Sequence, residues 1–128
     1  MKEPLEKLWI WQEANELACD IFKLNKNIKE YNLKNQIDRS SLSVVSNIAE
    51  MYGAYYYDVK KSSLRISRKE AYETISHLDI YQKRGIFTED ICMKLKGRYS
   101  KLIIGINCYI KYIGKSQDEY LKKNKNSV

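Results

Sequence analysis

Residues 91–113, with the sequence ICMKLKGRYSKLIIGINCYIKYI, carry the most regular apolar pattern in the chain. The apolar and aromatic positions that repeat are Ile91, Leu95, Tyr99, Leu102, Ile106, Tyr109 and Ile113. They advance by steps of four or three residues, so they fall on one side of an α-helix. The stretch therefore predicts a long amphipathic helix with one buried face.

Three segments with related patterns precede this stretch, at residues 5–28, 33–56 and 59–83. Their apolar residues repeat at helical or near-heptad spacing, which is typical of amphipathic helices. Pro4 is the only proline, so no strong helix breaker interrupts any of these segments. The chain therefore predicts four helices.

Short polar connections separate the predicted helices. Gly85 is suited to the left-handed conformation that ends a helix, while Asp58 and Thr88 are suited to capping the third and fourth helices. Four amphipathic helices with short connections pack economically as a bundle. We expect an all-α, up-down-up-down four-helix bundle over residues 1–114, followed by a basic, disordered tail at residues 115–128.

The composition argues against an enzyme, a metal site and a membrane protein. Cys19, Cys92 and Cys108 lack C-x-x-C spacing, so we expect reduced structural thiols. His77 is the only histidine, which leaves little for a metal site or a catalytic triad. No apolar run approaches the roughly 18 residues of a membrane span, and no signal peptide is evident. These observations predict a cytoplasmic protein without catalytic residues, metal ligands, cofactor or membrane partner.

The net charge of +7 is unevenly distributed. Residues 1–64 hold nine basic and nine acidic side chains, whereas residues 65–128 hold fourteen basic and seven acidic ones. A concentrated positive field attracts polyanions, which favours RNA or another nucleic acid as the partner. An acidic protein surface is an alternative partner, and a merely solubilising face is another interpretation.

Two groups of basic residues are candidates for phosphate contacts. On the third predicted helix, Lys61, Arg65 and Arg68 share one face with Tyr72 because they are three or four residues apart. A second group occupies the first turns of the fourth helix. The candidate nucleic-acid-binding residues are Lys60, Lys61, Arg65, Arg68, Lys69, Lys94, Arg98 and Lys101. Such side chains supply salt-sensitive contacts to a nucleic-acid backbone.

Aromatic residues are candidates for an interface. Tyr55, Tyr56 and Tyr57 are consecutive, so they cannot all point into one core. A contact between subunits is the preferred interpretation because tyrosine is enriched in interfaces, and base stacking is the second. Trp9 and Trp11 are expected to close one end of the bundle or to face another subunit.

Two stretches carry a family resemblance. They are LWIWQEA at residues 8–14 and QIDRSSLSVVSNIAE at residues 36–50, followed later by AYE at residues 71–73. Over residues 8–113 the chain resembles the four-helix-bundle proteins encoded within intervening sequences of 23S ribosomal RNA. It is also similar to the accessory variability determinant proteins of diversity-generating retroelements. The basic run that commonly follows the second stretch in the family is replaced here by residues 54–57.

The resemblance implies a homo-oligomeric ring, typically a pentamer, with a basic surface. It further implies RNA as a partner and, through the retroelement proteins, a reverse transcriptase. Arg39, Asn47, Glu50 and Glu73 match polar positions of the family motif, and a pairing of Arg39 with Glu50, or of Glu73 with a basic neighbour, would hold the second and third helices in register. The competing interpretation is a protein-interaction scaffold for an acidic protein, without a physiological nucleic-acid role.

Overall fold

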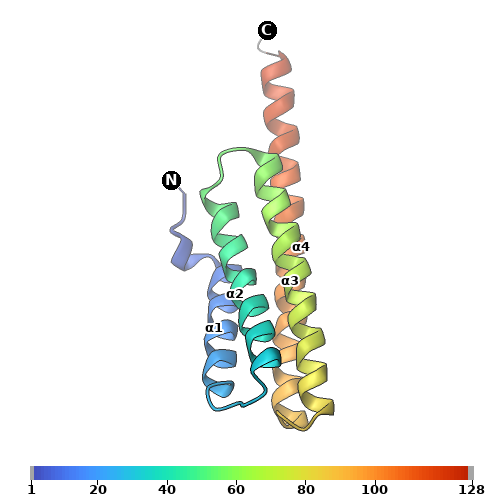
Figure 1. Ribbon diagram of the computed structural model, residues 1–128. Helices are drawn as coiled ribbons and strands as arrows, with labels where there is room; N and C mark the ends of the chain where they lie inside the picture. The colour runs from blue at the N-terminus through green and yellow to red at the C-terminus, as the bar shows by residue number, and fades with distance from the viewer. Residues whose placement is uncertain (1, 127–128) are drawn as a thin grey trace.

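Four antiparallel α-helices account for most of the structure, a computed structural model that describes residues 2–126 (Figure 1). The helices are α1 (Trp9–Leu24), α2 (Tyr31–Gly53), α3 (Tyr57–Lys83) and α4 (Glu89–Asn126), and a single 3₁₀ turn at Leu5–Lys7 precedes α1. The described residues contain no strand. The all-α prediction is therefore confirmed, and none of the described helices combines the length and apolarity that crossing a membrane requires.

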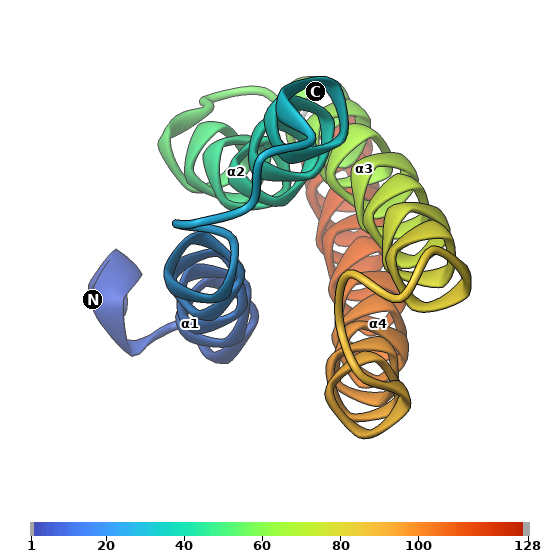
Figure 2. The ribbon, with the colours of Figure 1, turned by 60° about the horizontal axis from the view of Figure 1, so that its bottom comes forward.

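The helices form a closed ring in which each packs against the next and α4 packs back against α1 (Figure 2). This is the predicted up-down-up-down bundle. Side chains from all four helices fill the space between them, including the fully buried Leu17, Ile48, Leu64 and Leu102. Sequence periodicity locates this core because each helix turns its apolar stripe towards the axis of the ring.

Small polar residues let α2 and α3 approach closely. Ser40 Oγ lies 2.8 Å from Thr74 Oγ1 across the two helices, and Ser67 Oγ donates to the carbonyl of Val44 at 2.8 Å. Ser40 Oγ also donates to the carbonyl of Ile37 in its own helix. Every one of these hydroxyls is buried, and the hydrogen bonds satisfy them without bulk between the helices.

The connections follow the expected chemistry at two of three points. Gly85 has φ of +71°, the left-handed conformation that ends α3. The hydroxyl of Thr88 accepts a hydrogen bond from the backbone N–H of Ile91 at 3.3 Å, which caps α4. The prediction for Asp58 is wrong, because α3 begins one residue earlier and Asp58 lies inside its first turn. Its carboxylate is still favourable there, since it faces the positive end of the helix dipole.

The prediction of a disordered tail is also wrong for the described residues. Helix α4 continues through Asn126, and its last part, residues 115–126, projects beyond the other helices (Figure 1). We call these residues the C-terminal extension. Its first turns are held by α3: Lys61 Nζ donates to Gln117 Oε1 at 2.6 Å, and the rings of Tyr57 and Tyr120 lie 5.9 Å apart. Residues 127 and 128 of the predicted tail lie outside the described residues.

Candidate nucleic-acid interface

The basic face predicted on α3 lies along the contact between α3 and α4. Arg68 donates to Asn107 Oδ1 at 2.6 Å, and Lys61 donates to Gln117 Oε1 at 2.6 Å. Both acceptors belong to α4, so these two side chains lean towards that helix. Arg65 is exposed between them. The structure thus brings Lys61, Arg65 and Arg68 together, as the spacing predicted.

A basic residue of α4 joins the same surface. Lys111 is exposed and follows Asn107 by one helical turn, so it lies on the side of α4 that Arg68 reaches. Sequence spacing alone could not relate it to α3. We define the α3–α4 strip as the five cations of this surface and the exposed ring beside them: Lys61, Arg65, Arg68, Lys69, Lys111 and Tyr72.

Most cations of the α3–α4 strip make no ion pair within the described residues, although the charge of Lys69 acts on Glu70 and Glu73. Lys61 Nζ lies 3.7 Å from Asp58 Oδ1 across one turn of α3. Within residues 2–126, Arg65, Lys69 and Lys111 take part in no ion pair. Cations of this kind can meet a phosphate without first giving up a carboxylate partner.

Arg98, the central member of the second predicted basic group, is neutralised by acidic side chains of α1. Arg98 turns towards α1, where Nε donates to Glu13 Oε1 at 2.9 Å and NH1 donates to Asp20 Oδ2 at 2.9 Å; Glu16 lies 3.4 Å from NH2. Three carboxylates therefore surround Arg98. It joins α4 to α1, and we exclude it from the candidate phosphate contacts.

Lys94 and Lys101 lie about one helical turn before and after Arg98, on the same side of α4. Lys94 lines a groove of about 530 Å³ between α1 and α4, together with Leu24, Ile91 and Leu95. Lys101 is exposed and takes part in no ion pair within the described residues. Lys94 and Lys101 are thus both exposed cations that make no ion pair within the described residues.

Lys60 also departs from the predicted face. Its ammonium group donates to the carbonyl oxygens of Met51 at 3.0 Å and Tyr52 at 3.5 Å, at the C-terminal end of α2. Lys2 Nζ reaches the same Tyr52 carbonyl at 2.6 Å and lies 3.9 Å from the centre of the Tyr52 ring. Burial lowers the pKa of Lys60, and the positive charge of Lys2 lowers it further. Two ammonium groups therefore converge on one carbonyl.

The consecutive tyrosines divide as expected between surface and core. Tyr55 is 87% exposed and Tyr56 68% exposed, and their rings lie 5.0 Å apart in an edge-on arrangement. Tyr57 packs partly against the core, and its ring lies near that of Tyr120. A contact of these residues with a second subunit stays a prediction.

The two tryptophans lie near the start of α1. Trp11 packs partly against the core. Trp9 is about half exposed, and its ring lies against Gly105 of α4, where an added Cβ would come within 2.7 Å of Trp9 Cζ3. Trp9 thus holds the start of α1 to α4. That the tryptophans face another subunit stays a prediction.

The family-motif residues act mainly within the bundle. Arg39 of α2 pairs with Glu73 of α3 at 3.1 Å and with Glu70 at 3.6 Å. This confirms the predicted pairing of Glu73 across the two helices. Glu50 is exposed and is not among the partners of Arg39, so the predicted Arg39–Glu50 pair is absent from the described residues. Asn47 Nδ2 donates to the carbonyl of Ser43 within α2.

A buried polar cluster ties the α1–α2 connection to α3, and sequence reasoning did not find it. Tyr81 Oη donates to Asn25 Oδ1 at 2.7 Å, and Asn25 Nδ2 donates to Asp38 Oδ1 at 3.1 Å. Asn25 is fully buried, and burial raises the pKa of Tyr81 to about 12. The three residues come from distant parts of the chain, so no local pattern indicates the cluster.

Comparison with known proteins agrees with the fold. A family model described as 23S rRNA-intervening sequence protein matches residues 6–107. No curated protein sequence is significantly similar to the chain. The crystal structure of a protein of unknown function from the S23 ribosomal protein family of Bacteroides thetaiotaomicron is 25% identical, with a TM-score of 0.76 over 80% of this chain and 98% of that chain. Since the family model spans most of the bundle, the chain belongs to the 23S rRNA-intervening sequence protein family.

Proposed function

We propose that the chain is a non-enzymatic, RNA-binding accessory protein that contacts RNA phosphates along the α3–α4 strip. The observation that carries the proposal is that Arg65, Lys69 and Lys111, on one exposed surface, make no ion pair within the described residues. The family description, which refers to intervening sequences of ribosomal RNA, agrees with an RNA partner. Tyr72 offers an exposed ring at the same surface, where an unpaired base could stack.

The proposal includes self-association. Phe22 of α1 and Leu42 of α2 are each 61% exposed, and both line a groove of about 480 Å³ between these helices. Large apolar side chains that line an exposed groove are typical of protein contact sites. A homo-oligomer, such as the pentamer that the family resemblance implies, would cover this groove and would repeat the α3–α4 strip around the assembly.

Charge reversal tests the RNA contact. In a triple variant, Arg65→Glu, Lys69→Glu and Lys111→Glu change the strip by six charges without removing any ion pair of the described residues. We expect its affinity for labelled RNA to fall by at least roughly tenfold at low salt. The slope of log affinity against log salt should also become shallower, by about 0.7–0.9 for each phosphate that the variant no longer neutralises.

A matched triple variant provides the control. Lys7→Glu, Lys26→Glu and Lys29→Glu change the net charge by the same amount at exposed positions in or beside α1 and its connection to α2. We expect this control to retain most of the RNA affinity. Equal losses in both variants would mean that only net charge matters, and unchanged binding by the strip variant would overturn the proposal.

The alternative function is a scaffold for an acidic protein, and the exposed α1–α2 groove favours it. A reverse transcriptase is the protein partner that the resemblance to retroelement accessory proteins implies. Phe22→Ser and Leu42→Ser would remove the apolar contacts from the groove. If these substitutions abolish a protein complex while the purified chain binds no RNA at low salt, the scaffold function replaces the RNA-binding one. Light scattering of the same variants measures the mass of the assembly.

A further inference from the structure

Two adjoining cavities lie where α2 ends and α3 begins. The first, about 350 Å³, is lined by Tyr55, Tyr56, Tyr57, Lys60 and Tyr120. The second, about 250 Å³, includes Lys2 and Tyr52 and is closed on the α4 side by Tyr109 and Tyr112. Tyr57 and Lys60 line both cavities, so the two are immediate neighbours, and we treat them as one site. One part is mainly aromatic and the other carries two ammonium groups.

The aromatic part offers ring faces at the surface. The rings of Tyr55 and Tyr56 form a T-shaped pair, so each ring keeps at least one face that the other does not cover. The side chains of Tyr55 and Tyr56 are both far more exposed than side chains that pack in a core. Stacking of unpaired bases on aromatic side chains is a general means of binding single strands, and it needs no particular base.

The ammonium groups of the cationic part have N–H donors that their described contacts do not use. An ammonium group has three N–H donors, and the described contacts of Lys2 and Lys60 are to backbone carbonyls and a tyrosine ring. Neither lysine takes part in an ion pair within residues 2–126. Their mutual repulsion is therefore relieved by no described carboxylate. An anion placed between them would gain charge-assisted hydrogen bonds and would remove this repulsion.

The site depends on a part of α4 that lies outside the family match. The family model ends at residue 107, whereas Tyr109, Tyr112 and Tyr120 lie beyond it. The structural neighbour likewise covers only 80% of this chain. The α2–α3 connection supplies Tyr55 and Tyr56, and the continuation of α4 supplies the opposite wall. Part of the lining of the two cavities therefore comes from residues beyond the family match.

We infer that this site binds one unpaired nucleotide of a single-stranded RNA, with the base against the tyrosines and its phosphate beside Lys2 and Lys60. The inference rests on the proposed function, because the RNA held by the α3–α4 strip supplies the nucleotide. Lys61, the first residue of that strip, directly follows Lys60, but the two side chains leave α3 in different directions, so a strand must pass round the start of α3 to reach the site. Bases paired within a duplex are not free to enter it.

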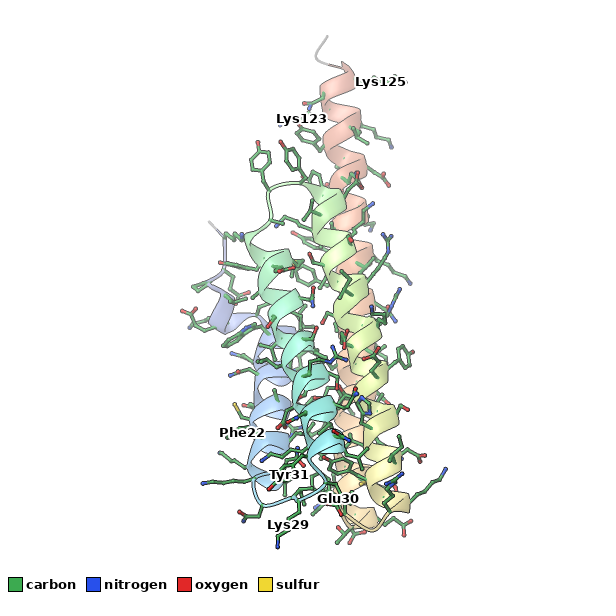
Figure 3. The ribbon with its side chains drawn as sticks, viewed as in Figure 1. Phe22, Lys29, Glu30, Tyr31, Lys123 and Lys125 are labelled. Atoms are coloured by element: carbon green, nitrogen blue, oxygen red, sulfur yellow. The ribbon has the colours of Figure 1, made fainter. Side chains whose placement is uncertain are left out.

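The test uses variants at exposed rings. Tyr55→Leu and Tyr56→Leu together keep apolar bulk but remove two stacking surfaces, and both rings are more than half exposed. Tyr31→Leu is the matched control, because Tyr31 is 67% exposed and lies at the opposite end of the bundle from Lys123 and Lys125 of the C-terminal extension (Figure 3). Circular dichroism should show the same melting for wild type, double variant and control, since exposed substitutions seldom change stability by more than about 0.5 kcal/mol.

The probe is a single-stranded oligoadenylate RNA that contains one 2-aminopurine, compared with an RNA duplex of equal length. We expect wild-type protein and the Tyr31→Leu control to quench the 2-aminopurine fluorescence by stacking. The double variant should lose this quenching and bind the single strand about tenfold more weakly. Its affinity for the duplex should be unchanged, because duplex binding uses only the α3–α4 strip.

Three results would overturn the inference, and they are distinguishable. If charge reversal on the strip abolishes binding but the tyrosine double variant quenches and binds like wild type, the proposed function stands and this site is wrong. If the double variant lowers the mass of the assembly in light scattering while 2-aminopurine is never quenched, the tyrosines form a subunit contact instead. If wild-type protein binds neither RNA, the proposed function and the inference both fail.

Discussion

Gly105 of α4 lies directly against the indole ring of Trp9, so closely that a Cβ at this position would come within 2.7 Å of Trp9 Cζ3. We predict that Gly105→Ala destabilises the bundle by about 1–3 kcal/mol, because the ring must move or α1 must shift. Gly97→Ala is the control: no atom lies within 4 Å of its added Cβ. Since alanine favours a helix interior, this control should gain roughly 0.5–1 kcal/mol. Urea unfolding of the two variants measures both changes, and equal effects would contradict the close contact.

The hydroxyls of Tyr81 and Tyr99 are both buried but have different environments. Tyr81 Oη donates to Asn25, whereas Tyr99 Oη has no hydrogen-bond partner among the described residues. We predict that Tyr81→Phe costs about 1–3 kcal/mol, because it leaves the buried Asn25 oxygen without its donor. Tyr99→Phe should be neutral or stabilising, since it removes an unpaired polar atom. Thermal and chemical unfolding would detect the difference, and a larger loss for Tyr99→Phe would contradict it.

Glu70 and Glu73 respond to pH in opposite directions. Burial raises the pKa of Glu70, and its contact with Glu73 raises it further. Ionised Glu70 therefore opposes folding. Protonated Glu70 contributes stability, which is fully present below the pKa of the unfolded state and is lost as pH rises through the pKa of the folded state. We predict that Glu70→Gln is more stable than wild type at pH 7 and that this advantage shrinks towards pH 4. Arg39, which is largely exposed, keeps Glu73 as a partner in this variant.

Glu73→Gln is the reciprocal variant. Burial acts to raise the pKa of Glu73, but its contacts with Glu70 and Arg39 outweigh burial and lower the pKa. Ionised Glu73 therefore contributes stability above the unfolded pKa that is lost as pH falls through the folded pKa. The substitution should reduce stability at pH 7, and this loss should shrink as pH falls towards the folded pKa. Urea unfolding between pH 4 and pH 7 measures the stability of both variants. If the two stabilities, relative to wild type, changed with pH in the same direction, the pKa values of Glu70 and Glu73 would not be shifted in opposite directions.

Arg98 and Arg65 have different expected roles: Arg98 joins α4 to α1, whereas Arg65 is a proposed RNA contact. Arg98→Gln leaves Glu13, Glu16 and Asp20 without their shared cation, so we predict a loss of about 1–3 kcal/mol in stability. RNA affinity should change little. Arg65→Gln should leave stability within about 0.5 kcal/mol of wild type but weaken RNA binding and reduce the salt slope by about 1. RNA-binding titrations and unfolding of the two variants test both expectations. If Arg98→Gln weakened RNA binding and Arg65→Gln did not, Arg98 would be the phosphate contact.

Local sequence patterns predict the helices well because each apolar stripe is a local property. The stripe of residues 91–113 identifies the core of α4 without further information. The C-terminal extension escapes such reasoning because its anchors, Tyr57 and Lys61, are on another helix and some 60 residues away in sequence. A polar, lysine-rich segment is read as disordered when nothing local indicates a partner.

Local sequence spacing predicts the candidate site only in part. Lys61, Arg65 and Arg68 share a face through spacing alone, so the sequence suffices for them. Arg98 looks equally available in the sequence, because its acidic partners in α1 lie about 80 residues earlier in the chain. Lys111 joins the strip only once the Arg68–Asn107 contact fixes how α3 and α4 face each other.

A groove borders α1 on each side, so α1 is the helix at which the bundle should open first. One groove separates α1 from α4 and the other separates it from α2, whereas α2 and α3 are joined by hydrogen bonds of buried hydroxyl groups. Local unfolding should therefore begin at α1, and its amide hydrogens should exchange before those of the α2–α3 pair. Self-association over the α1–α2 groove would then slow exchange in α1 selectively, which makes the least protected helix the one whose stability depends on protein concentration.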